Sequence, residues 1–369
     1  MRARSEESSV RRRHFIASVK AYGYGYGTLP VVRAVLDNGA DMIAVGNLEE
    51  AIRVRRNGIK APILVFGNAL DDALTHYLEH DLIPAVFNFS TAETLSRIAT
   101  KDVTVYVKVE TGLGRLGVAA EDAPRFVKRT LTLPRIRIGG IYTHLGPNAG
   151  VKDKTYAEWQ FQRFTDAVSA LESEGIHIPV QQAANSSAIL DMPHTYMTAV
   201  CPGAALYGMV ETQAPKVQAT FNVPFIALKS CIIQVREVAA GHNVSGMVTG
   251  RTSLLATILI GHADGYSNVH AGGHVLVHGM RVPIVSALSL EHTKLDVTDV
   301  PGVAVGDEVV LIGSQGSQTI TLGDAAKTAN RQVRELLSGF VCKLPYVCFR
   351  DGKAVWLSWH LGEVNLAGS

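Results

Sequence analysis

Cysteine is scarce in this chain, and its distribution excludes two common kinds of stabilising site. Four cysteines occur among 369 residues, at positions 201, 231, 342 and 348, and no two form a Cys-x-x-Cys pair. This pattern indicates neither a disulfide framework nor a zinc site, so we expect no metal. The sequence also lacks long apolar runs and an initial signal segment. We therefore expect no membrane association and a cytoplasmic location.

An excess of charge of one sign is lacking as well. Lysine and arginine number 35 and aspartate and glutamate 33, which gives a net charge of +2 at pH 7. This balance does not favour nucleic acid as a partner. Hydrophobic residues make up 47% of the chain and charged residues 18%. Such a composition is typical of a well-packed folded protein, and a cytoplasmic enzyme is consistent with it.

Short apolar runs alternate with amphipathic segments over the first part of the chain. Helical patterns are clearest at 48–58 and 155–175. The strand-like runs lie at 14–20, 41–45, 62–67, 83–87, 104–110, 138–145, 178–184 and 198–203. Buried parallel strands separated by helices predict a (β/α)8 TIM-like barrel over residues 1–221.

The pattern changes after a linker at 210–224. Strand-like segments with glycine and aspartate turns follow at 228–238, 254–261, 274–280, 282–290 and 307–313. They predict a mostly β domain over residues 222–369. One late helix, at about 323–338, is expected before a final pair of strands.

Lys20 ends the first apolar run and precedes a loop rich in glycine and tyrosine, AYGYGYG. Active sites of such barrels lie at the carboxyl ends of the strands. Partial burial there lowers the pKa of a lysine and makes its amine nucleophilic. An ordinary surface lysine before a glycine-rich loop is the alternative, and the lysine taken alone favours that alternative.

The fifth run alternates valines at 105, 107 and 109 with Tyr106, Lys108 and Glu110. If the valines face the helices, the polar side chains point into the barrel, where charges must be paired. Arg115 follows on a glycine-rich loop and could bind a carboxylate or a phenolate oxygen. A structural ion pair between Lys108 and Glu110 is an alternative that is compatible with function.

Polar residues also end the last three runs of the predicted barrel. His144 ends the sixth run, Asn185 and Ser186 follow the seventh, and Gly203 and Ala204 follow the eighth. Phosphate groups in such barrels often bind after the last two strands. A helix cap and a turn would explain each pair separately. Their joint position favours a phosphate site.

Several motifs together resemble those of the alanine racemase family. The motifs are SVKAYGYGYG, VKVETGLGRLGV, GGIYTHL, AANSSAIL, PGAALYG, GHADGY, VPIVSALSLEHTKLDVTD and VGDEVVLIGSQG. Their order and spacing match over about residues 14–349. The resemblance implies a fold-type III enzyme that uses pyridoxal 5′-phosphate (PLP). It further implies a homodimer and racemisation at Cα of a small amino acid.

The resemblance also implies roles for individual residues. Lys20 would form a Schiff base with PLP, and Arg115 would contact the phenolate oxygen and the substrate carboxylate. His144 would lie over the cofactor ring, and Lys108 matches a lysine that is often carbamylated. The residues expected to hold or flank the phosphate are Tyr24, Asn185, Ser186, Gly203 and Ala204.

The chain departs from the family pattern at several positions. Cys201 stands where family members carry an arginine that faces the pyridine nitrogen, and Gly246 stands where they carry a catalytic tyrosine. The other departures are His262 for a second tyrosine, Leu290-Glu291 for a Met-Asp pair, and Cys342 for a late tyrosine. A two-base racemase needs a proton acceptor on each face of Cα, and only Lys20 is retained.

Three functions follow from this combination. The first is a racemase-like isomerase in which His262, or another group, replaces the missing base, since histidine titrates near neutrality. His262 is equally compatible with an ordinary turn. The second is a PLP enzyme of the same fold that catalyses decarboxylation, elimination or proton exchange on one face. The third is a PLP-binding paralogue without catalysis.

Overall fold

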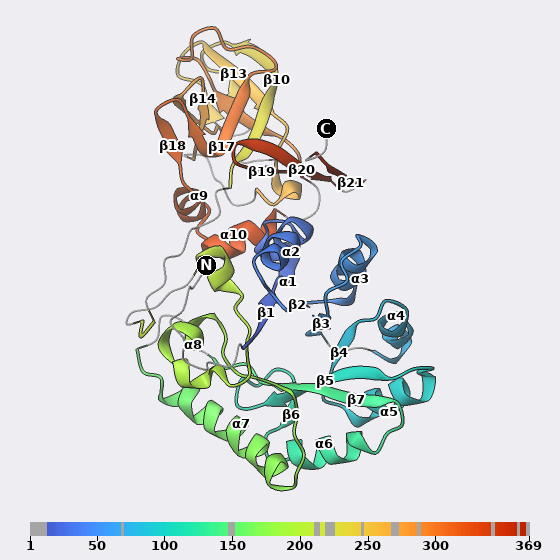
Figure 1. Ribbon diagram of the computed structural model, residues 1–369. Coiled ribbons are helices and arrows are strands. Elements are labelled where there is room, and N and C mark those ends of the chain that lie inside the picture. The colour runs from blue at the N-terminus through green and yellow to red at the C-terminus, as the bar shows by residue number, and fades with distance from the viewer. Residues whose placement is uncertain are drawn as a thin grey trace. The chain divides into compact units, whose positions relative to one another are not determined.

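The chain divides into two compact units, Met1–Val223 and Pro224–Ser369 (Figure 1). The computed structural model describes residues 13–67, 70–146, 152–209, 215–217, 226–244, 247–266, 273–285, 289–340, 344–359 and 362–366. Most of the expected linker at 210–224 lies outside these ranges. Each unit is described by itself.

The first unit is a closed barrel of parallel strands. The sheet order is β4-β3-β2-β1-β9-β8-β7-β5, and pairing of β4 with β5 closes the ring. Its strands are β1 (His14–Ser18), β2 (Met42–Val45), β3 (Ile63–Val65), β4 (Ile83–Val86), β5 (Val103–Glu110), β7 (Ile136–Tyr142), β8 (Val180–Gln182) and β9 (Ala199–Val200). All eight predicted strands are therefore confirmed. The short β6 (Val118–Ala119), which pairs with β5, was not predicted.

Helices connect the strands and cover the outside of the barrel (Figure 1). They are α2 (Thr28–Asp37), α3 (Leu48–Arg56), α4 (Leu74–Glu79), α5 (Phe89–Ile98), α6 (Ala123–Leu131), α7 (Thr155–Ser173) and α8 (Ser186–Asp191). The helical patterns at 48–58 and 155–175 correspond to α3 and α7 and are confirmed. Helix α7 is the longest of these helices and buries Phe164 against the apolar layer outside the strands.

The period-two pattern of β5 separates two apolar layers. The valines at 105, 107 and 109 belong to the layer shared with the helices, as predicted. Tyr106 belongs instead to the cluster inside the barrel, where it pairs in register with Gly140 of β7. A Cβ on Gly140 would lie 2.4 Å from the Tyr106 ring. Only glycine at 140 leaves room for this aromatic ring within the barrel.

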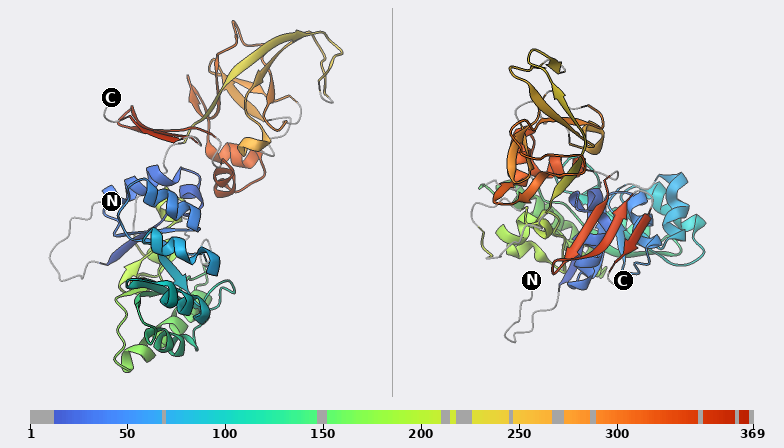
Figure 2. Two further views of the ribbon diagram at one scale, coloured as in Figure 1. Left: turned by 90° about the vertical axis from the view of Figure 1, so that its right-hand side faces the viewer. Right: turned by 90° about the horizontal axis from the view of Figure 1, so that it is seen from above.

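The second unit is mostly antiparallel β structure, in agreement with the prediction (Figure 2). Its main sheet has the order β15-β14-β17-β10-β13-β16, and β18 pairs with β17. These strands are β10 (Leu228–Val238), β13 (Ser253–Ile258), β14 (His274–Val277), β15 (Met280–Pro283), β16 (Thr293–Asp296), β17 (Glu308–Gln315) and β18 (Gln318–Ile320). A short ribbon pairs β11 (Asn243–Val244) with β12 (Met247–Val248).

The end of the second unit corrects two predictions. The single late helix expected at 323–338 is two helices, α9 (Leu322–Thr328) and α10 (Val333–Gly339). They separate because Asn330 takes a left-handed φ of 50°, which a continuous right-handed helix does not allow. The final pair of strands is a three-stranded sheet of β19 (Tyr346–Arg350), β20 (Lys353–Trp359) and β21 (Gly362–Asn365).

No helix within the described ranges is both long enough and apolar enough to cross a membrane.

Candidate active site

Lys20 lies where the chain leaves β1, at the carboxyl end of the barrel. It opens the single turn α1 (Lys20–Tyr24), in which all four following residues have positive φ, from 53° to 62°. Left-handed backbone costs about 1–2 kcal/mol for each residue other than glycine. Neighbouring structure must therefore hold this turn in place and, with it, the start of the lysine side chain.

The surroundings of Lys20 favour a neutral, nucleophilic amine. Burial, and to a smaller extent the Arg115 guanidinium, lowers the pKa of Lys20. Loss of the proton exposes the nitrogen lone pair, which is the form that attacks carbonyl carbon. Lys20 is partly buried, as its strand-end position predicted.

Lys108 points into the same end of the barrel. Its side chain is 5% exposed, and its Nζ lies 4.5 Å from the centre of the Tyr142 ring. Burial, assisted by Arg115, lowers the pKa of Lys108 to about 8. Cys201 is also buried there, and burial raises the pKa of its thiol to about 12, so the thiol is neutral. These groups form a site with more positive than negative charge.

Glu110 shapes the loop that carries Arg115. Its carboxylate accepts hydrogen bonds from the backbone N–H groups of Gly112 and Arg115, the latter at 3.1 Å. No ion pair joins Glu110 to Lys108 within the described ranges, although Glu110 acts on Lys108 electrostatically. The Tyr156 hydroxyl donates to the Gly112 carbonyl oxygen at 2.7 Å. Hydrogen bonds with the side chains of Glu110 and Tyr156 therefore hold the loop that carries Arg115.

His144 follows β7 and stays neutral. Burial, followed by the nearby cations Lys108, Lys20 and Arg115, lowers the pKa of His144 to about 3. A neutral imidazole carries no charge to repel a cationic neighbour, and it offers a flat face to a ring. The predicted residues Lys20, Lys108, Arg115 and His144 are close enough to one another to interact electrostatically.

The segments after β8 and β9 form a small cradle around the Ser186 hydroxyl. The Ser186 Oγ accepts hydrogen bonds from the Gly203 N–H at 2.9 Å and the Ala205 N–H at 3.0 Å. Its own proton remains able to donate to an acceptor such as an anion. A Cβ at position 203 would lie 2.4 Å from the Tyr24 hydroxyl oxygen, so only glycine admits that hydroxyl.

Asn185 holds the cradle next to His144. Its Oδ1 accepts from the Ala188 N–H at 3.1 Å and caps α8, while its Nδ2 donates to the Leu145 carbonyl oxygen at 2.6 Å. The two bonds join the segment after β8 to the segment after β7. Ala204 begins the short 3-10 turn η3 (Ala204–Tyr207) directly after Gly203.

Sequence reasoning missed Glu50, a buried carboxylate on α3. Its Oε1 accepts from the Tyr22 N–H at 2.6 Å and from the Thr28 hydroxyl at 3.2 Å. Burial raises the pKa of Glu50, and the Tyr22 amide is the strongest opposing influence. Glu50 therefore stabilises the left-handed turn that follows Lys20. Its position just after β2, at the catalytic end of a barrel, was the available signal.

The remaining predicted residues belong to the second unit. His262 begins the 3-10 turn η4 (His262–Asp264) and is exposed, and its backbone N–H donates to Ser289. Leu290 and Glu291 are also exposed. Gly246 and Cys342 lie outside the described residues.

Taken together, the fold and the site define a barrel protein with a partly buried lysine among cations, beside a serine hydroxyl whose proton can be donated to an anion. Residues 2–211 match the alanine racemase N-terminal domain and residues 225–348 match the C-terminal domain. The chain belongs to the alanine racemase family, whose members are PLP-dependent isomerases.

Individual relatives cover nearly the whole chain. Alanine racemase of Methanococcus maripaludis is 35% identical over 89% of this chain and 91% of its own length. Alanine racemase of Desulfosudis oleivorans is 36% identical over 92% and 91%. The structure of Bacillus anthracis alanine racemase with bound L-Ala-P covers 95% of this chain and 92% of its own, with 28% identity and a TM-score of 0.81.

Proposed function

We propose that this chain is a racemase-like isomerase that acts at Cα of a small amino acid, with Lys20 holding PLP covalently. When bound, PLP supplies an electron sink that makes the Cα proton acidic. The observation that carries the proposal is the partly buried Lys20 amine with its lowered pKa beside Arg115 and Lys108. An amine freed of its proton can hold an aldehyde carbon and can also move a proton at Cα on one face.

The residues present fit the phosphate of PLP. Ser186 can donate its free hydroxyl proton, since its oxygen already accepts two backbone N–H groups. The Tyr24 hydroxyl lies against Gly203, where no Cβ fills the space. We assign phosphate binding to Tyr24, Ser186, Gly203 and Ala204, with Asn185 holding the segment in position.

Charged and aromatic groups at the same end suit the rest of the ligand. Arg115 would bind the phenolate oxygen of the cofactor and the substrate carboxylate through its planar set of N–H donors. His144, kept neutral by burial and by neighbouring cations, would lie over the cofactor ring. The positive charge of these cations favours the binding of anionic oxygens at this end of the barrel.

We propose that Lys108 is carbamylated and then serves Arg115 as an anionic partner. A neutral amine attacks CO2, forms an N–C bond and releases one proton, so the reaction requires the deprotonated lysine. With its pKa at about 8, Lys108 gains reactivity as pH rises through 8, well below the ordinary 10.5.

With 13C-bicarbonate, a carbamate resonance should grow through pH 8 and vanish in Lys108→Ala. The exposed Lys60 provides a matched control, and Lys60→Ala should keep the resonance. A signal that rises only near pH 10.5, or that survives Lys108→Ala, contradicts the assignment.

Divergence from the family pattern bears on the reaction. We infer that Cys201 replaces the arginine that faces the pyridine nitrogen, and that Gly246 replaces the catalytic tyrosine. The Cys201 thiol is neutral because burial raises its pKa to about 12, so it places no cation against a protonated ring nitrogen. In the first candidate function His262 supplies the second base. In the second candidate function, racemisation is replaced by one-face proton exchange, decarboxylation or elimination. The neutral Cys201 thiol favours this second candidate.

One experiment tests the attachment and separates these candidates. The protein saturated with PLP is reduced with borohydride and its labelled peptide is mapped. A separate sample of the PLP-saturated protein, which has not been reduced, is incubated with D- or L-alanine in deuterium oxide. We expect the label at Lys20 and loss of the Cα proton from both enantiomers. Exchange from one enantiomer alone identifies the second candidate, and a label on another lysine overturns the assignment.

We also propose that the chain forms a homodimer, as its resemblance to the family implies. Light scattering should give twice the chain mass of 39.6 kDa. A monomer that retains full activity would contradict the dimer.

A further inference from the structure

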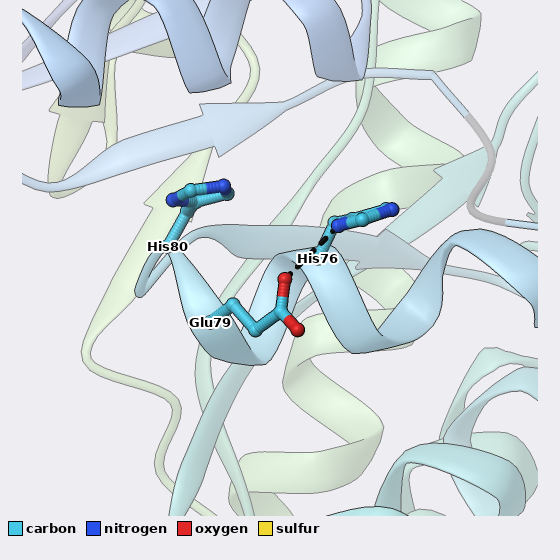
Figure 3. A group of neighbouring side chains, drawn as sticks. All are labelled: His76, Glu79 and His80. Atoms are coloured by element: carbon cyan, nitrogen blue, oxygen red, sulfur yellow. Dashed lines mark hydrogen bonds and ion pairs between the residues drawn. The ribbon is translucent and has the colours of Figure 1, made fainter.

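A histidine pair and a glutamate share one end of α4, away from the residues assigned above. The sequence there is His76-Tyr77-Leu78-Glu79-His80, with α4 ending at Glu79 and His80 following as its cap. Residues spaced by three and four lie on one face of a helix. Figure 3 shows the three polar side chains at this end of the helix.

The geometry brings three potential ligand atoms together. One ligand atom from each of His76, Glu79 and His80 lies within 4.8 Å of the others. His76 Nδ1 already lies 3.0 Å from Glu79 Oε2, and the two imidazole rings are nearly parallel, at 17°. Tetrahedral ligands bound to Zn²⁺ lie about 3.3 Å apart, given bonds of about 2.0–2.1 Å. Since His76 and Glu79 are exposed, small rotations of their side chains can close the remaining gap.

We propose that His76, Glu79 and His80 bind a divalent cation of the zinc class on the surface of α4. Two imidazoles and one carboxylate suit Zn²⁺, and water would complete a tetrahedral set. Mg²⁺ is disfavoured, because it prefers oxygen ligands in an octahedral arrangement. Binding would tie the last turn of α4 to its cap residue.

The charged groups next to this cluster are of both signs, and each cation among them already has an oxygen partner. The guanidinium of Arg55 donates to the backbone carbonyl oxygens of His80 and Asp81, and the exposed Asp81 carboxylate lies 3.7 Å from Lys101 Nζ. The Glu79 carboxylate would lose its contact with His76 Nδ1 or share it with the metal. An exposed pair of this kind contributes little to stability, so the rearrangement costs little.

Equilibrium dialysis of the PLP-saturated full chain against ZnCl2 tests the site. A second exposed histidine–glutamate pair, His194 and Glu158, with 2.8 Å between Nε2 and Oε2, gives the control. The part of the chain that the structure describes adds no third ligand to that pair. The comparison uses His76→Ala, His80→Ala and the control His194→Ala, with MgCl2 as the second ion.

We expect one zinc ion per chain in the wild type and in His194→Ala. Affinity should fall at least about tenfold in His76→Ala and in His80→Ala, since even partners outside the ligand set change metal affinity by that amount. Zinc should raise the unfolding temperature of the wild type and of His194→Ala, but not that of His76→Ala or His80→Ala. Zinc affinity unchanged in His80→Ala, or equally reduced in His194→Ala, overturns the proposal, as does equal uptake of Mg²⁺.

Discussion

Lys20→Ala should abolish covalent PLP attachment while leaving the barrel folded. The substitution removes the amine that we propose both to hold the aldehyde carbon and to act as the base on one face of Cα. General acid–base catalysis alone contributes about 10²–10⁴-fold, so we expect proton exchange at Cα to fall by at least about 10³-fold. The measurements are borohydride labelling and loss of the Cα proton from alanine in deuterium oxide.

The same substitution should not lower the stability of the cofactor-free protein. Burial and Arg115 both disfavour a charged amine at position 20, and its removal ends that penalty. The unfolding temperature of the cofactor-free Lys20→Ala protein should therefore equal or exceed that of the wild type. Lys60→Ala, at an exposed position, should change neither labelling nor exchange. Full exchange activity in Lys20→Ala would remove this amine from the mechanism.

The barrel could be predicted because its strands carry their own signal. Buried parallel strands read as apolar runs, and each of the eight predicted runs overlaps an observed strand. In β5 the alternation of valines with polar residues also gave the side-chain direction, so that the sequence alone placed Lys108 inside the barrel. Lys20 lies two residues beyond the end of β1, which is near enough for the strand-end rule to find it.

Glu50 could not be predicted in the same way, because its partner is distant in sequence. The segment Asn47-Leu48-Glu49-Glu50 has the pattern of a helix start, and Asn47 does accept from the Glu50 N–H at 2.8 Å. In that pattern the glutamate side chain normally accepts a hydrogen bond from the backbone N–H of the N-cap residue of the same helix. Here the side chain crosses to the Tyr22 amide, because parallel pairing of β1 with β2 brings the two loops together.

The break between α9 and α10 has a similar cause. The apolar pattern at 323–338 is continuous enough to suggest one helix, yet Asn330 adopts a left-handed φ of 50°. Asparagine tolerates that conformation better than most residues, but does not require it. A new helix start then forms at Gln332, whose N–H donates to the Glu335 carboxylate at 3.0 Å. The apolar periodicity therefore does not show whether the helix continues through Asn330 or ends there.

Glu50→Ala should weaken PLP binding and destabilise the turn after Lys20. The Tyr22 N–H and the Thr28 hydroxyl would lose their acceptor beside a turn of left-handed residues. An unsatisfied buried group costs about 1–3 kcal/mol, or about 5- to 150-fold in affinity if the cost falls on the bound state. PLP affinity, measured by absorbance titration, and the unfolding temperature should both fall.

Two further variants separate positioning of Lys20 from a general loss of stability. Glu50→Gln retains an oxygen that can accept from the Tyr22 N–H, so it should recover most of the PLP affinity. Glu49→Gln changes an exposed neighbouring carboxylate and should leave binding unchanged. If Glu50 holds the turn, Glu50→Ala should also shift the pH at which the absorbance of Lys20-bound PLP changes, because the amine leaves its buried position. An unchanged titration with a lowered unfolding temperature would mean that Glu50 stabilises the barrel without positioning Lys20.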